Sequence, residues 1–384
     1  MHSFASDPTR GLFILGILIV LSGFGLLLYA MRAASLKSPG RYQAFSREVL
    51  LMGNNVFLCA ATLVVLLGTL LPLVHKELGL GSISVGAPFF NQMFTLLIVP
   101  FVLMLGLGPL TRWKQQKASE LQKQLSIAGG IALSAGVLVN FAYDEPTYMG
   151  VLGMVLVFWI LVTTVQEVLQ RLSAMPSSNS DNASVLSKLR KLTPSHWGMV
   201  LGHVGFAICI IGITLVSNYE MERDVRMDIG DTVSLGGYDF SFRDVVKVQG
   251  PNFEADKGVF DVYQDGELIA HLEPEKRLYI VQRMPMTEAA IHSNPIRDLF
   301  IAMGEPLDNG AWAIRIYIKP FVIWLWAGAV VMAIGGIFSI SDKRYRMAKV
   351  KKIKRVFGGK GKNDAEQSHG QVSTPSNASV KGGA

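Results

Sequence analysis

The stretch WGMVLGHVGFAICIIGITLVS, from Trp197 to Ser217, contains no Asp, Glu, Lys or Arg. As a helix it measures about 30 Å, which matches the hydrocarbon core of a bilayer. His203 lies in the middle of this stretch. An ionisable side chain at membrane depth is costly unless it has a partner, so His203 is the first candidate for a functional residue.

The residues alone leave two roles open for His203. It can hydrogen-bond a neighbouring helix, or it can serve as a metal ligand or a proton relay, because imidazole binds iron and a helix presents it rigidly. Gly202 and Gly205 flank His203, and we expect them to leave room for a large, flat group beside the helix.

The rest of the chain has the composition of a polytopic membrane protein. Half of its 384 residues are hydrophobic, and apolar runs with few charges recur along it. Seven runs are predicted to span the membrane, at residues 12–31, 50–74, 89–110, 127–143, 148–168, 197–217 and 321–341. Residues 1–174 would hold the first five spans, 175–196 a cytoplasmic linker, and 342–384 a basic, disordered tail.

The charges between the spans predict the orientation of the chain. Four segments are basic, namely those after spans one, three and five and the tail after span seven, whereas the segment after span two is nearly neutral and the one after span four is acidic. Basic segments stay in the cytoplasm, so we expect the N-terminus outside and the C-terminus in the cytoplasm. The net charge of +7 therefore belongs to membrane-flanking segments and does not indicate nucleic-acid binding.

That orientation makes the start of the chain unusual. About ten residues precede the first span, and no signal peptide is present to carry them outward. We therefore expect an N-terminal half that is missing or separately encoded. Direct insertion of a short polar segment is the alternative.

Residues 218–320 differ in composition and predict a periplasmic β-rich domain. Acidic residues outnumber basic ones there, 18 to 11. Alternating patterns predict strands at residues 238–248, 258–263, 277–282 and 312–318, and Asp265-Gly266 is a hairpin signal between two of them. A short helix is expected at residues 296–303.

The cysteines and the other histidines indicate a function less strongly than His203 does. Cys59 and Cys209 lie inside spans, so neither forms a structural disulfide in an aqueous domain and no thiol redox chemistry is indicated. Interfacial, surface or hydrogen-bonding roles are expected for the histidines at positions 75, 196, 271 and 292. No nucleotide-binding, nucleophile or metalloprotease motif occurs, so residue chemistry alone indicates a membrane protein with an intramembrane histidine and an outer β-domain.

Motifs spread over residues 1–346 nevertheless resemble those of a known protein family. They include HSFASDPTRG (2–11), LGTLLP (67–72), SVGAPFFN (84–91), GPLTRW (108–113), GHVG (202–205), ERDVRM (222–227), MTEAAI (286–291), NGAWA (309–313), YIKPFV (317–322) and DKRYR (342–346). Together they resemble the C-terminal half of the CcmF family, the large membrane subunit of the bacterial cytochrome c haem lyase.

The resemblance implies a function and a set of ligands. Family members take haem from a periplasmic haem chaperone and attach it to the CxxCH thiols of apocytochrome c, together with a thiol-reducing lyase partner subunit. A tryptophan-rich periplasmic segment holds the substrate haem between two histidines, of which the second matches His2. A separate haem b is bound in the membrane by two helix histidines, of which the second matches His203, and passes electrons to the substrate haem iron.

The chain also departs from the family pattern. It lacks the tryptophan-rich segment and the first histidine of each pair, so we expect an upstream CcmF N-terminal half and no lyase activity from this chain alone. His196 stands where the family has an aromatic residue, so it receives no role from the resemblance. Two rival functions stay open. One is a membrane haem transporter or non-catalytic assembly scaffold, and the other is a lyase specialised for a nitrite reductase.

Overall fold

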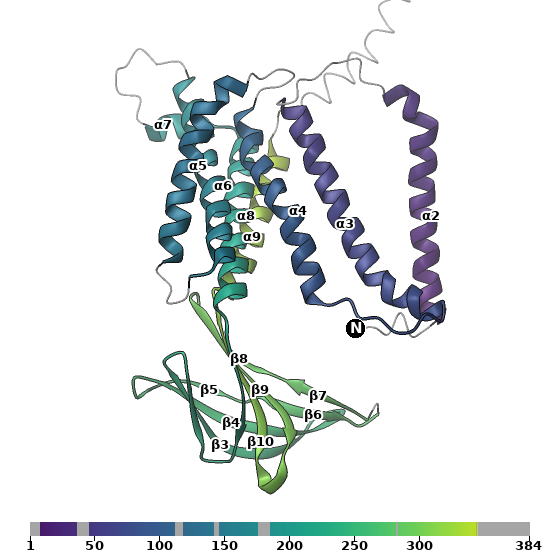
Figure 1. The fold of residues 1–384 in the computed structure, drawn as a ribbon, viewed down its shortest axis with the longest axis vertical. Helices are drawn as coiled ribbons and strands as arrows, with labels where there is room; N and C mark the ends of the chain where they lie inside the picture. Colours follow the sequence, from purple (N-terminus) through teal and green to yellow (C-terminus); the bar gives the residue numbers. More distant parts are fainter. Residues whose placement is uncertain are drawn as a thin grey trace, which may run out of the picture.

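The computed structural model describes residues 8–36, 46–111, 118–141, 146–175, 185–281, 283–342 and residue 344. These residues form a bundle of long helices with one β-domain below it (Figure 1). The β-domain lies in the sequence between the last two long helices, so the predicted fold class is confirmed.

Seven long helices make up the bundle. They are α2 (Pro8–Arg32), α3 (Arg47–Glu77), α4 (Ala87–Leu107), α5 (Ala118–Asn140), α6 (Tyr148–Ser173), α8 (Pro194–Tyr219) and α9 (Val322–Ser341). Short helical pieces join them at η1 (Ala33–Leu36), η2 (Gly108–Leu110) and α7 (Val185–Leu189). The predicted tail beyond residue 344 and residues 176–184 of the predicted linker lie outside the described residues.

Six of these helices are long and apolar enough to cross a membrane, among the described residues. Each of the six coincides with a predicted span. The fourth predicted span, at residues 127–143, falls in α5, which is not one of the six. Its first turns read SELQKQ, and these polar residues lower the mean hydropathy of the helix.

Helix α8 is the packing centre of the bundle. Its start is fixed by Thr193, whose side chain accepts a hydrogen bond from the His196 N–H, and by Pro194 in the first turn. One face of α8 packs closely on α9, and α6 packs on another side. The buried core between α4, α5, α6 and α8 includes Val102, Ala132, Val157, Ile160 and Ala207.

Gly205 of α8 packs against a helix, which corrects the expectation of open space at this glycine, whereas the space beside Gly202 is open. A Cβ atom added at Gly205 would lie 2.7 Å from the Gly328 carbonyl oxygen of α9, so the two backbones touch there. A Cβ added at Gly202 would meet no atom within 4 Å. The room that Gly205 provides is therefore filled by α9, as in other close-packed membrane helix pairs.

The β-domain is a sandwich of two antiparallel sheets. One has the order β1-β10-β9-β8 and the other β2-β3-β4-β6-β7, with β5 also paired to β4. The strands are β1 (Met221–Met227), β2 (Thr232–Leu235), β3 (Tyr238–Gln249), β4 (Phe253–Gln264), β5 (Glu267–Leu272), β6 (Glu275–Tyr279), β7 (Met284–Glu288), β8 (Ala290–Ser293), β9 (Arg297–Pro306) and β10 (Trp312–Pro320). Inward side chains of both sheets fill the core, where Phe242 and Phe260 stack at 4.6 Å.

The hairpin and the strands predicted at residues 238–248, 258–263 and 312–318 are confirmed, the strand predicted at 277–282 ends at Tyr279, and the predicted short helix is wrong. Asp265 and Gly266 both have positive φ and join β4 to β5 as a two-residue hairpin. Residues 296–303 do not form a helix, because strand β9 covers most of them. Alternate residues from Arg297 to Met303 are buried, which is the period of a strand.

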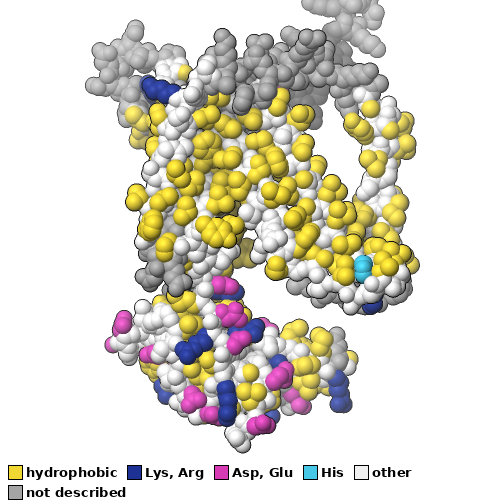
Figure 2. Space-filling view, in the orientation of Figure 1, with side chains coloured by type: hydrophobic (Ala, Val, Ile, Leu, Met, Phe, Trp, Pro, Cys, Tyr) yellow, Lys and Arg dark blue, Asp and Glu magenta, His cyan; other side chains and the backbone are white. Residues whose placement is uncertain are grey.

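Single residues join the sandwich to the bundle. Glu220 alone separates α8 from β1, and Phe321, with φ 55°, alone separates β10 from α9. Since β1 pairs with β10 from Met221 opposite Ile318 onward, the α8–α9 helix pair continues directly into a strand pair. Figure 2 shows the result, an apolar bundle surface above a β-domain that carries charges of both signs.

Candidate functional site

His203 lies on α8, nine residues from the start of the helix, and is 9 % exposed. Its Nδ1 lies 2.9 Å from the carbonyl oxygen of Met199, one turn earlier. A carbonyl only accepts, so Nδ1 carries the proton in this contact and Nε2 holds the lone pair. The geometry thus accommodates both a packing role and a ligand role for His203.

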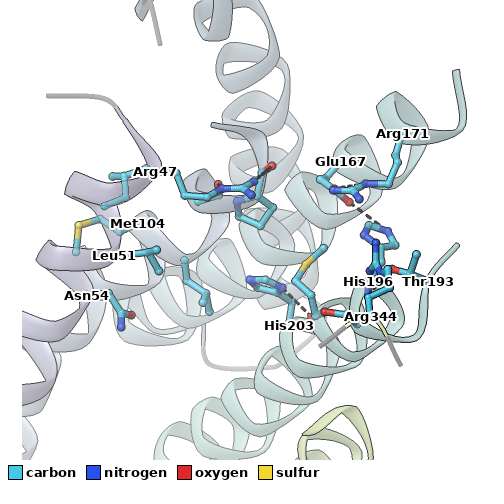
Figure 3. Close-up of a pocket in the computed structure, with 16 residues that line it drawn as sticks. Arg47, Leu51, Asn54, Met104, Glu167, Arg171, Thr193, His196, His203 and Arg344 are labelled. Carbon is cyan, nitrogen blue, oxygen red and sulfur yellow. Dashed lines mark hydrogen bonds and ion pairs between the residues drawn. The ribbon is translucent and has the colours of Figure 1, made fainter. Parts of the chain in front are cut away.

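A pocket of about 460 Å³ opens beside His203. Helices α3, α4, α6 and α8 line it, and Figure 3 shows His203 facing the same space as Arg47, Leu51, Asn54 and Met104. This volume falls within the usual range for small-molecule and cofactor pockets. Apolar side chains form much of the wall around the imidazole, so the pocket combines an apolar body with one nitrogen lone pair.

Charged side chains gather at one end of the pocket (Figure 3). They lie near the start of α3, the end of α6 and the start of α8, which are on the side of the bundle remote from the β-domain (Figure 1). Glu167 of α6 is 5 % exposed and accepts a hydrogen bond of 3.0 Å from Arg171 Nε. Its second oxygen lies 3.4 Å from Nε2 of His196, which is also 5 % exposed, but the two atoms do not form a hydrogen bond. Arg47 donates hydrogen bonds to the carbonyl oxygens of Gly108 and Pro109.

The chain beyond α9 closes this end of the bundle. The Asp342 side chain is 3 % exposed and accepts a hydrogen bond from the backbone N–H of Ser195, in the first turn of α8. Arg344 donates to both oxygens of Asp342 and itself lines the pocket. The Arg344 guanidinium lowers the pKa of Asp342 to about 2. The hydrogen bond from Ser195 to Asp342 therefore joins the start of α8 to the end of α9 beside the pocket.

The histidines that the sequence indicated lie in different surroundings. His203 is in the pocket, and His196, expected at the interface, is buried beside it. His75 and His271 hydrogen-bond the Gly81 carbonyl and Asp261, at 2.9 and 2.6 Å. His2 lies outside the described residues. No group of three or more His, Cys, Asp or Glu suited to a metal ion occurs in the described part of the chain.

Sequence reasoning missed Glu167, Arg47 and Arg171 as pocket residues. Glu167 sits at the end of a predicted span, and a carboxylate at that position was the available signal. Arg47 and Arg171 were interpreted only as basic residues that orient the chain. Their convergence depends on the packing of α3 beside α4 and α6, which no local pattern contains.

Known proteins resemble this chain in sequence. Residues 218–320 match the family described as the CcmF C-terminal beta-sandwich. The chain is 45% identical over 347 residues to the cytochrome c-type biogenesis protein CcmF of Haemophilus influenzae and 47% identical over 347 residues to that of Escherichia coli. Each alignment covers 90% of this chain and 52% of the relative. The chain thus spans about half the length of the curated relatives it matches.

Two further matches complete the comparison. The chain is 32% identical over 356 residues to the cytochrome c-type biogenesis protein NrfE of Haemophilus influenzae, across 91% of this chain and 53% of the relative. A solved structure of the cytochrome c haem lyase CcmF superposes with a TM-score of 0.67 at 21% identity. It covers 87% of this chain and 51% of the solved chain, and it shows that the fold is shared.

Proposed function

We propose that this chain, which matches the cytochrome c-type biogenesis proteins CcmF over about half their length, is the C-terminal portion of a cytochrome c haem lyase. In this function it accepts haem from a periplasmic haem chaperone and contributes to its covalent attachment to apocytochrome c. The observation that carries the proposal is a buried histidine, His203, facing a cofactor-sized pocket within a membrane-spanning helix.

His203 is the residue that would hold haem b in this pocket. The contact of Nδ1 with the Met199 carbonyl orients the ring and leaves Nε2 as the iron-binding nitrogen. A bound haem b supplies electron transfer to the iron of the substrate haem.

The remaining ligands and partners follow from the length of the chain. His196 is the only other histidine that lines the pocket among the described residues, and it faces Glu167. A second axial ligand would come from an upstream CcmF half, since the relatives are about twice as long. His2 would be an axial ligand of the substrate haem at the periplasmic face. The β-domain residues 218–320 contain no cysteine, which fits a separate thiol-reducing lyase partner subunit.

The proposed orientation places the β-domain in the periplasm of a bacterial inner membrane. The segments that follow α2, α4 and α6 and the tail are basic in sequence, and helices α2, α4, α6 and α9 all end on the side of the bundle remote from the β-domain. Basic segments favour the cytoplasm, so the C-terminus would be cytoplasmic.

The rival functions are less well supported. A transporter would favour broken helices that converge near the midplane, yet α3 and α4 both continue through their internal prolines, Pro72 and Pro100. Identity is also higher to the CcmF relatives, at 45% and 47%, than to NrfE, at 32%, so a general haem lyase is preferred to the nitrite-reductase form.

The proposal is tested by a reduced-minus-oxidised visible spectrum of the purified chain, with and without a co-expressed upstream half. We expect a bis-histidine b-type spectrum only when both halves are present. His203→Ala should remove this spectrum and block haem attachment while the protein still assembles in the membrane. His75→Ala, at the other end of the bundle, is the control and should change neither. Absence of haem from the unmodified pair, or normal attachment by His203→Ala, would contradict the proposal.

A further inference from the structure

A row of polar side chains runs along one side of helix α3. Asn55, Cys59, Thr62 and Thr69 follow one another at steps of four, three and seven residues, so they lie on one face of the helix. All four are exposed. We call this row the α3 polar stripe.

The α3 polar stripe lies at membrane depth. The apolar part of α3, Arg47–Lys76, has 30 residues. Its length is about 45 Å, which exceeds the hydrocarbon core of a bilayer at about 30 Å. A core centred on this helix covers about residues 52–71, which include the whole stripe. Lipid chains offer these side chains no hydrogen bonds.

Asn55 is the group on the stripe that lacks a partner. The Thr62 hydroxyl donates to the Leu58 carbonyl at 2.9 Å, and the Thr69 hydroxyl donates to the Val65 carbonyl at 2.7 Å, so both bonds stay within α3. The Asn55 amide has two donors and one acceptor oxygen, and no described residue forms a hydrogen bond with it. Polar side chains at this depth face other helices and bond across them.

Helix α4 occupies the opposite face of α3. A Cβ atom added at Gly68 would lie 2.7 Å from the Phe90 ring of α4, and one added at Gly53 would lie 2.9 Å from the Met104 sulfur. Thr62 follows Gly53 by nine residues, which is two and a half turns and therefore the other side of the helix. The stripe is thus not part of the α3–α4 contact.

Helix α2 does not cover the stripe either. The pairs α3–α4, α5–α6 and α8–α9 pack directly on one another, whereas α2 does not pack closely on α3, although it precedes α3 in the chain. Figure 1 shows α2 standing apart from α3. The apolar window of α2 is 0% buried and that of α3 is 6% buried. Among the described helices, none therefore packs closely on the α3 polar stripe.

We propose that the α3 polar stripe binds a transmembrane helix of a partner protein, and that this helix presents a hydrogen-bonding side chain to Asn55. A lipid chain cannot form that bond. A second copy of this chain would bring its own α4 together with its α3, whereas a single helix can enter between α2 and α3. The partner is thus a protein with an apolar helix of about twenty residues that contains a polar side chain.

The test uses a photo-activatable benzophenone amino acid in place of Thr62, in the full chain and in membranes of the cells that produce it. Irradiation should join the chain to a second polypeptide, and mass spectrometry should map the joined peptide to an apolar, membrane-spanning segment with a polar residue. The same amino acid in place of Leu138, a residue of α5 that is 71% exposed, is the control and should label mainly lipid.

Asn55→Leu should lower the yield of this cross-link by about three- to twentyfold, which corresponds to the loss of one hydrogen bond between membrane helices. The unfolding temperature of the purified variant should not fall, because the amide has no partner within the described chain. Asn91→Leu makes the same substitution at an exposed asparagine of α4 and should leave the yield unchanged.

Four results would overturn the proposal. They are cross-links to lipid alone, cross-links between two copies of the chain or to its own α2, an unchanged yield in Asn55→Leu, and a lower unfolding temperature of that variant, which would place the partner of the amide inside the chain. Haem binding at His203 enters none of these measurements, so the proposed function stands or falls separately.

Discussion

At the scale of single residues, the end of the proposed site that is remote from the β-domain is a buried ionic cluster. Glu167 and His196 are each 5 % exposed, and transfer of a charge from water to such a place is costly unless it is paired. Arg171 supplies that pairing for Glu167, whereas His196 contacts it at 3.4 Å without a hydrogen bond. Buried pairs contribute little net stability but lose much when one partner is removed. The cluster therefore acts mainly to fix how α6 and α8 face each other.

Asp342 gives a pH-dependent prediction at the same scale. Arg344 holds the pKa of Asp342 at about 2, below the unfolded value of about 3.9. The stabilisation is therefore complete above about pH 4 and is lost as the pH falls through the folded pKa. Asp342→Asn should lower the unfolding temperature in detergent at pH 7, and its difference from the unmodified chain should shrink below pH 4.

The control for Asp342 is Asp308→Asn, an exposed carboxylate of the β-domain. It should leave the unfolding temperature at pH 7 nearly unchanged. A constant difference between Asp342→Asn and the unmodified chain from pH 7 to pH 3 would contradict the ionic account of this contact.

The sequence predicted the central residue of the site but not its surroundings. His203 stands out because a membrane span contains a single ionisable group. Arg47 and Arg344 lie 297 positions apart in the chain, and only tertiary packing brings both to one pocket. The burial of His196 beside Glu167 likewise depends on how α6 packs on α8, so a single span could not predict it.

At the scale of elements, the α8–α9 pair is organised by glycines seven residues apart. Gly198, Gly205 and Gly212 of α8 face α9, and Gly328 and Gly335 of α9 face α8. A seven-residue spacing keeps small residues on one seam of a left-handed helix pair. His203 is off this seam, so the side of α8 that faces the pocket is independent of the side that binds α9.

Substitution of a glycine in the seam tests whether α8 and α9 are closely packed. Gly205→Ala would place a Cβ 2.7 Å from the Gly328 carbonyl oxygen, so the helices must separate. We expect the free energy of unfolding to fall by about 1–3 kcal/mol. Gly202→Ala is the matched control, because its Cβ meets nothing within 4 Å. Equal stability of the two variants in thermal unfolding would show that the seam is not closely packed.

The elements that the sequence predicted well are those with a long or regular pattern. The membrane helices and the Asp265-Gly266 hairpin follow from apolar length and from turn residues with positive φ. The sequence predicts a short helix at residues 296–303, where the structure has strand β9. The apolar part of this stretch, LFIAM, is short, and short apolar runs suit either structure. The pairing of β9 with β8 and β10 decides in favour of the strand.

At the scale of the whole molecule, the least buried spans lie on one side. The apolar windows of α2 and α3 are 0% and 6% buried, compared with 44% for α6, and Figure 1 shows α2 standing apart from the other helices. Helix α3 is also a wall of the His203 pocket. The proposed second haem ligand would therefore reach the pocket most directly from this side.

The β-domain is built to fold apart from the membrane helices. Its buried core, which includes Met227, Phe240, Phe260 and Ile316, comes from residues of the sandwich alone. Its first and last strands pair with each other, so the two ends of the domain lie side by side. Both features are typical of autonomous domains. We therefore expect residues 218–320, expressed alone, to be soluble, to give a β-sheet circular dichroism spectrum and to unfold cooperatively.

A shorter fragment, residues 230–320, provides the matched comparison. It removes β1, and with it the fully buried Met227 and the strand that covers one edge of β10. The exposed edge and the missing core side chain should make this fragment aggregate or unfold at a much lower temperature. Equal stability of both fragments would mean that β1 belongs to the helical bundle rather than to the sandwich. Failure of the longer fragment to fold would make the α8–α9 pair part of the folding unit, and the close coupling of that pair to β1 and β10 would then extend from the His203 pocket to the sandwich.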